Sequence, residues 1–71
     1  MINKLPLTTR EEEILAFIYG YIDDNQYSPT RKEIADKFKM STQAAEYFIK
    51  QLSEKKKLKI TTGKWRNIKL L

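Results

Sequence analysis

The fold of this 71-residue chain is decided by residues 28–52, which read SPTRKEIADKFKMSTQAAEYFIKQL. Pro29 disfavours a helical conformation at Ser28, so the segment opens as a turn. Thr30 is followed three residues later by Glu33, a capping-box pattern that predicts a short helix beginning at about Arg31. The side chains expected on the inner face of this helix are Ile34, Ala35 and Phe38.

A tight turn at Lys39-Met40 is predicted to lead into a longer helix, capped by either Ser41 or Thr42. Apolar residues then recur with the spacing of one buried helical stripe: Ala45, Phe48, Ile49 and Leu52. The same periodicity places an amide, a carboxylate, a phenol and an ammonium group on the opposite face, an unusual mixture for a passive surface. These residues are Gln43, Glu46, Tyr47 and Lys50, with Thr42 and Ala44 at the start of the helix.

Before this region, the sequence predicts an N-terminal helix of about four turns. Its first turn carries one of two capping boxes, Thr8 with Glu11 or Thr9 with Glu12, and acidic residues there suit the helix dipole. The polar residues 23–26 are expected to end the helix as a loop. A single apolar stripe defines its buried face: Ile14, Phe17, Ile18, Tyr21 and Ile22.

After the central region, the hydrophobic period changes from that of a helix to that of a strand. Leu58 and Ile60 alternate with polar residues, as do Ile68 and Leu70, and Gly63 supplies a turn between them. The chain is therefore predicted to be mainly α with a small β-hairpin. Three helices and a two-stranded wing make a winged helix-turn-helix, and we expect one domain spanning residues 1–71.

The composition excludes most catalytic chemistry. The chain has no cysteine and no histidine, which removes thiolate and imidazole metal ligands and the commonest nucleophile–base pairs. The run Glu11-Glu12-Glu13 falls in a first helical turn and is interpreted as complementing the helix dipole, not as a catalytic pair. No apolar run approaches a membrane span, and no signal peptide opens the chain. We therefore expect a cytoplasmic protein without enzymatic activity, cofactor, metal or membrane partner.

Charge is distributed unevenly along the chain, whose net charge is +5. Residues 1–36 contain four Lys/Arg and seven Asp/Glu, whereas residues 37–71 contain ten Lys/Arg and two Asp/Glu. This asymmetry indicates one basic face and an anionic partner, although a solvated lysine surface would give the same count.

Several segments together resemble the N-terminal DNA-binding domain of the LexA repressor family, from about Leu5 to Leu71. They are Leu7-Thr8, the run from Ser28 to Ala35, the triplet Ala44-Ala45-Glu46, and the ending Gly63…Arg66-Asn67-Ile68-Lys69-Leu70-Leu71. The resemblance implies a sequence-specific regulator of transcription, expected to be a repressor, that binds double-stranded DNA through the third helix. It also implies a nucleoid-associated protein of bacterial, phage or plasmid origin. The family's peptidase domain and the dimerisation surface it provides have no counterpart in this sequence.

The side chains expected to read bases lie on the third helix. Gln43 can pair with adenine and Glu46 can accept a hydrogen bond from cytosine N4, although on any exposed helix such side chains are usually just solvated. Tyr47 either touches a thymine methyl or sugar, or lies partly buried against the second helix.

A second group of residues is expected to contact the DNA backbone. Lysines and arginines at the end of the third helix and in the wing are candidates for phosphate contacts: Lys50, Lys55, Lys56, Lys64 and Arg66. Two helix N-termini are candidate anion sites, at Ser41 with Thr42 and at Thr30 with Arg31. Trp65 either packs over the hairpin or against the first helix, or contacts the DNA backbone or minor groove from the wing.

A protein-interaction module is the alternative function. A domain with one reading head binds DNA weakly unless two copies share two half-sites, so a homodimer on DNA is expected of a regulator. Without such a dimer, the same basic helix could bind an acidic protein partner, as an antirepressor or an assembly partner would.

Overall fold

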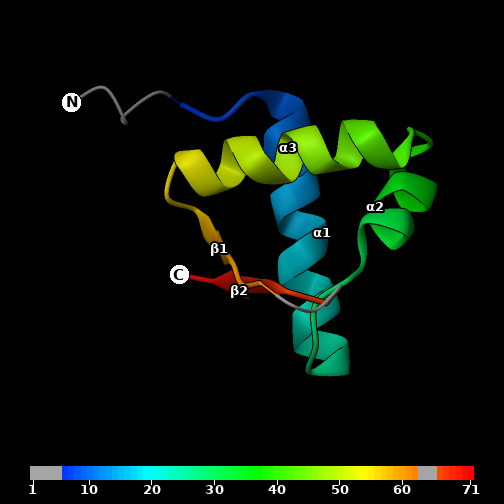
Figure 1. Cartoon of the computed structure of the whole chain (residues 1–71), viewed down its shortest axis with the longest axis vertical. Helices are drawn as coiled ribbons and strands as arrows, with labels where there is room; N and C mark the ends of the chain where they lie inside the picture. Colours follow the sequence, from blue (N-terminus) through cyan, green and yellow to red (C-terminus); the bar gives the residue numbers. More distant parts are fainter. Residues whose placement is uncertain (1–5, 63–65) are drawn as a thin grey trace.

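Three helices and a two-stranded antiparallel sheet form within residues 6–62 and 66–71, the part of the chain that the computed structural model describes (Figure 1). The helices are α1 (Thr9–Asn25), α2 (Arg31–Phe38) and α3 (Thr42–Glu54). The strands are β1 (Leu58–Ile60) and β2 (Ile68–Leu70). The predicted mainly α fold with a small hairpin is confirmed.

Each helix begins at a hydroxyl-bearing residue, and two of the three begin with a full capping box. In α1 the Thr8 hydroxyl accepts the Glu11 amide at 3.2 Å, and the Glu11 carboxylate accepts the Thr8 amide at 2.9 Å. Thr30 and Glu33 make the same exchange at 3.1 and 2.9 Å. In α3 the cap is Ser41, whose hydroxyl accepts the Ala44 amide at 3.0 Å. Thr8 and Ser41 are thus the caps among the alternatives that the sequence left open.

The end of α1 differs from the prediction. Residues 23–25 continue the helix instead of forming a loop, and the helix stops only at Gln26, whose φ is 67° and whose amide bonds Ile22 O at 2.8 Å. Exposed polar side chains do not interrupt the backbone hydrogen-bond ladder, and the side-chain Nδ2 of Asn25 donates a further bond to Tyr21 O at 2.9 Å. A reversal of φ does interrupt the ladder, and this determines where α1 ends.

The core lies where α3 crosses α1, and α2 and the hairpin close it from either side (Figure 1). Several side chains predicted to face the core are only half-buried: Phe17, Tyr21, Ile22, Phe38 and Phe48. All of them except Tyr21 pack at the edge of the core. Each element contributes fully or almost fully buried aliphatic side chains: Ile14 and Ile18, Ile34 and Ala35, Ala45, Ile49 and Leu52, and Leu58 with Ile68. This interlocking set fixes the orientation of α3 relative to the rest of the domain.

The hairpin has the predicted period of two. Leu58 pairs with Leu70, Lys59 with Lys69 and Ile60 with Ile68. Leu58 and Ile68 are buried, whereas the two lysines face solvent. Beyond the last pair, the Thr61 amide bonds Asn67 O at 2.8 Å and the Asn67 side-chain amide bonds Thr61 O at 2.8 Å. Asn67 therefore closes the mouth of the wing.

Within the described ranges, none of the helices combines the length and the apolar character that a membrane crossing requires.

Replacing Lys39 by glycine is expected to raise the free energy of unfolding by about 0.5–1 kcal/mol. Lys39 ends α2 with a φ of 56°, a left-handed conformation that costs a residue with a Cβ more than it costs glycine. Urea unfolding of the purified domain measures the change. The matched control is Lys37→Gly inside α2, which should lower stability by about 1 kcal/mol. Equal or lower stability of the Lys39→Gly variant would contradict this account of the turn.

Candidate nucleic-acid interface

The outer face of α3 is open to solvent along its length. Thr42, Gln43, Tyr47 and Lys50 are exposed, whereas Ala44 and Glu46 are half-buried. Tyr47 is 57% exposed and meets Phe48 edge-on with ring centroids 5.4 Å apart. Tyr47 is therefore not buried against α2, which was one of the two possibilities that the sequence left open for this residue. The other side of α3 is anchored in the core, so the helix presents these side chains from a rigid support.

The N-terminus of α3 is electrostatically different from those of the other two helices. Glu11 and Glu33 place a carboxylate against the first turns of α1 and α2, but the first turn of α3 contains no acidic residue. A helix N-terminus carries a partial positive charge and unpaired amides, so the start of α3 favours an external anion. By contrast, the hydroxyl and amide of Thr30 are both used in its own capping box.

Arg31, the first residue of α2, connects this helix to α3 and to the wing. Its Nε donates to Glu46 Oε1 at 2.7 Å, and its Nη1 donates to Asn67 Oδ1. The Arg31 side chain is 18% exposed and that of Glu46 is 45% exposed. Glu46 is thus held by an arginine on one side while part of its carboxylate remains accessible to solvent.

Arg66, which the sequence suggested as a phosphate contact, is engaged inside the domain. Its guanidinium forms a two-pronged ion pair with Glu33, with both N–O distances at 2.9 Å. It also donates to Ser28 O at 2.9 Å and to Tyr21 Oη at 3.2 Å, and it lies 4.6 Å from the ring centroid of Tyr27. This cluster joins the wing to the start of α2. The sequence offered no signal for it beyond the capping-box role of Glu33.

Lys55, another predicted phosphate contact, is also engaged. Its Nζ lies 2.7 Å from Glu11 Oε1, and these side chains are only 14% and 5% exposed. The remaining lysines near α3 and on the described part of the wing are exposed and pair with no described carboxylate: Lys50, Lys56, Lys57, Lys59 and Lys69. The two wing residues Lys64 and Trp65 lie outside the described residues.

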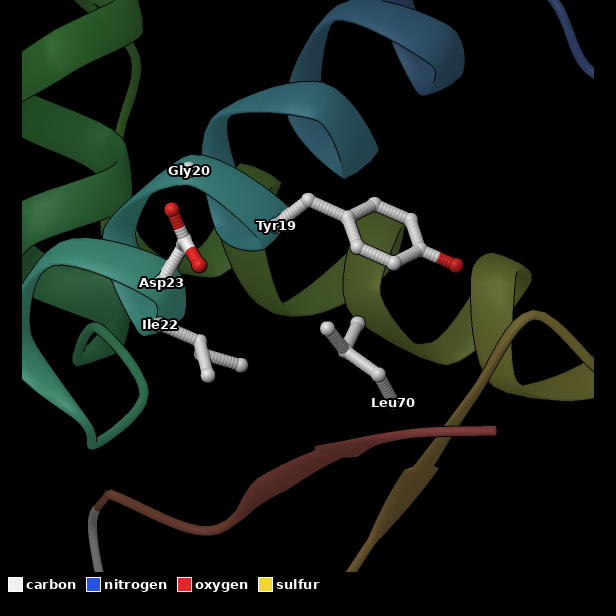
Figure 2. A pocket seen from close by; sticks show the side chains of 5 residues that line it. All are labelled: Tyr19, Gly20, Ile22, Asp23 and Leu70. Carbon is white, nitrogen blue, oxygen red and sulfur yellow. The ribbon is translucent and has the colours of Figure 1, made fainter.

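A shallow depression of about 420 Å³ lies between α1 and β2, as Figure 2 shows. It contains none of the residues predicted to bind DNA, so it does not belong to the candidate interface. Its lining residues are Tyr19, Gly20, Ile22, Asp23 and Leu70. Among the described residues, no cluster of three or more carboxylates could hold a metal ion.

The Glu33–Arg66 pair predicts how stability depends on pH. Hydrogen bonds from Arg66, and then from the Thr30 amide, lower the pKa of Glu33 from 4.5 to about 2. A lowered folded-state pKa stabilises the protein above pH 4.5, and this stabilisation is lost as pH falls from 4.5 to about 2. Because the Glu33 side chain is 36% exposed, solvent screening reduces the expected loss to on the order of 1 kcal/mol.

Thermal unfolding between pH 2 and pH 6 checks this expectation. The variant Arg66→Met should be less stable at neutral pH and should lose less stability than the wild-type chain in the acid window. If Arg66→Met loses as much stability as the wild type on acidification, the Glu33–Arg66 pair is not responsible for the acid dependence of stability.

A short helix, a tight turn and a longer helix with an open polar face, followed directly by a hairpin, make a winged helix-turn-helix domain of the DNA-binding class. Residues 4–67 match the model of the LexA DNA binding domain family. The chain belongs to this family, as the resemblance had suggested.

Proteins named LexA repressor are similar to this chain. That of Pseudomonas chlororaphis is 47% identical over 68 residues, which cover 93% of this chain and 33% of the relative. That of Saccharophagus degradans is 42% identical over 65 residues, covering 90% and 32%. That of Aliivibrio fischeri is 40% identical over 67 residues, covering 93% and 32%. The chain thus spans about a third of the length of these relatives.

Proposed function

We propose that this domain binds double-stranded DNA in a sequence-specific manner and regulates transcription as a repressor, with α3 in the major groove. One observation carries the proposal: α3 is anchored in the core by one face and exposes a continuous polar face beside an N-terminus whose first turn has no acidic residue. Membership of a DNA-binding domain family supports it. The repressor role is proposed because the similar proteins are named LexA repressor.

The base-reading residues proposed are those on the outer face of α3. Gln43 has the two-ended amide that pairs with adenine N6 and N7, and Glu46 accepts a hydrogen bond from cytosine N4. Tyr47 contacts a thymine methyl or a sugar from its exposed position. Thr42 and the small Ala44 allow the first turn of the helix to approach the base edges closely.

The phosphate contacts proposed surround this face. The first-turn amides of α3, together with Ser41 and Thr42, receive one phosphate, and Lys50 receives another. Lys64 and Trp65 contact the backbone from the wing. Thr30, Arg31 and Arg66 act mainly by holding α2 and the wing in position, because their polar groups are already engaged within the domain.

We propose two copies for each site. One domain with a single reading helix has a small interface, and a second copy on an adjacent half-site multiplies the affinity through effective concentration. We propose that the domain acts in the bacterial cytoplasm, where chromosomal DNA is located.

Titration of the domain against operator-like and scrambled duplexes tests the proposal. The salt concentration is varied between about 50 and 300 mM, because binding through phosphate contacts depends strongly on salt in this range. The logarithm of the binding constant should fall with the logarithm of salt with a slope of about −3 to −5 for each bound domain, as about four phosphates per domain require, and about twice that for a site filled by two copies. Binding without a salt slope, or no binding at low salt, would overturn the proposal. Binding only to an acidic protein partner would favour the interaction module instead.

A further inference from the structure

The residues Asn67, Arg31 and Glu46 form a chain of contacts that leads from the mouth of the wing to the outer face of α3. Asn67 Nδ2 donates to Thr61 O at 2.8 Å, so its Oδ1 must face the other way, toward Arg31 Nη1. Arg31 Nε in turn donates to Glu46 Oε1 at 2.7 Å. Each of these contacts sets the orientation of the next, because Asn67, Arg31 and Glu46 are joined by directional hydrogen bonds.

A carboxylate that faces DNA needs such a partner. An unpaired Glu46 would be repelled by phosphates and would sample several rotamers. Arg31 compensates the charge of Glu46 and orients it, while the second carboxylate oxygen has no hydrogen bond to any described residue. Arg31 is itself largely buried at 18% exposure, which restricts its movement.

We propose that Asn67 and Arg31 are positioning residues for DNA recognition, which hold the free Glu46 oxygen as an acceptor for a cytosine amino group. The inference rests on the proposed function and extends it: residues of the wing mouth and of α2 determine specificity without touching a base. Both ends of the Asn67 side chain already bond within the domain, to Thr61 O and to Arg31 Nη1, so its proposed effect on specificity does not require a contact with DNA.

The test measures discrimination, defined as the ratio of dissociation constants for the preferred duplex and for duplexes with single base-pair changes. Asn67→Ala and Arg31→Lys are expected to lower discrimination by about tenfold at the base pair read by Glu46, with non-specific affinity changed by less than about twofold. Asn67→Asp loses the donor to Thr61 but should retain discrimination, because either of its two equivalent carboxylate oxygens can accept from Arg31 Nη1 without that bond to orient it. Thermal unfolding of each variant identifies any that are misfolded.

A double-mutant cycle tests whether Asn67 acts through its contacts with Arg31 and Glu46 or through a general structural effect. In a Glu46→Ala background, Asn67→Ala should have no further effect on discrimination. In the DNA-free protein, the NMR signal of the Arg31 Nε proton should shift in Asn67→Ala and remain close to wild type in Asn67→Asp.

The outcomes distinguish this inference from the proposed function. If the wild-type domain discriminates among duplexes but Asn67→Ala or Arg31→Lys discriminates equally well, the positioning role of these two residues is overturned. The proposed function in DNA recognition is then still supported. An equal loss in Asn67→Asp and Asn67→Ala, or an undiminished effect of Asn67→Ala without Glu46, would also overturn the positioning role. A wild-type domain that does not discriminate at all would overturn both.

Discussion

The double variant Gln43→Ala/Tyr47→Ala is expected to lose about 30- to 100-fold in discrimination between preferred and scrambled duplexes. Each good base contact contributes about 1–3 kcal/mol of discrimination, and these two side chains are exposed on the reading face of α3. Non-specific affinity should fall by less than about threefold, because neither side chain carries charge and non-specific binding is mainly electrostatic. Fluorescence anisotropy with labelled duplexes at fixed salt gives both quantities.

Two controls give this prediction its contrast. Tyr19→Ala removes another exposed tyrosine, which is 47% exposed on α1, and should leave discrimination unchanged. Lys50→Ala should weaken binding to all duplexes about equally and lower the magnitude of the salt slope by about 1. A uniform loss of affinity for every duplex in the double variant would contradict the roles proposed for Gln43 and Tyr47.

Replacing Lys55 by methionine is expected to lower the free energy of unfolding by about 2–4 kcal/mol at pH 7. The change leaves the Glu11 carboxylate almost fully buried without its cation, since the Lys55 ammonium lies 2.7 Å from it and is mostly buried too. Domains of this size have only about 5 kcal/mol of stability, so the melting temperature should fall by more than about 10 °C. Calorimetry or circular dichroism measures the change.

The pH dependence identifies the cause of this loss. Burial opposes ionisation of Glu11, but hydrogen bonds from Lys55 and the Thr8 amide outweigh it and lower the pKa of the carboxyl. Without Lys55, burial should raise this pKa above its unfolded value, so the deficit of the variant should be larger at pH 7 than at pH 4.

Two variants are controls for Lys55→Met. Lys57→Met removes an exposed lysine two residues away and should cost little. Glu11→Gln/Lys55→Met should regain part of the stability, because glutamine can still accept the Thr8 amide. A deficit that is independent of pH and not reduced in the double variant would show that packing of the Lys55 side chain, not its charge, accounts for the loss.

The elements of this fold were predictable from the sequence because their signals are local. Capping patterns at Thr8 and Thr30 lie within one helical turn of the helices they begin, and the α3 periodicity assigned Ala45, Ile49 and Leu52 to the core. The prediction failed at the end of α1, where the polar composition of residues 23–25 was interpreted as a loop. Polarity indicates exposure, and an exposed segment can be helical.

The candidate reading face was also predictable, since the buried stripe of α3 fixes its opposite face. The residues expected on that face are exposed or half-buried in the structure. Their contacts with DNA remain predictions. The roles of the basic residues were not predictable, because the sequence does not show which lysines and arginines near the interface are paired inside the domain and which are exposed.

The sequence by itself determined the start of each helix, the hairpin and the face of α3 that points outward, because each depends on a pattern contained within one short segment of the chain. Only the tertiary structure decided which cations are available to an anionic partner. Arg66 pairs with Glu33 across 33 positions, Lys55 with Glu11 across 44, and Arg31 with Asn67 across 36. Such pairs exist only after the core has brought α1, α2, α3 and the wing together, and no local pattern encodes the resulting distances.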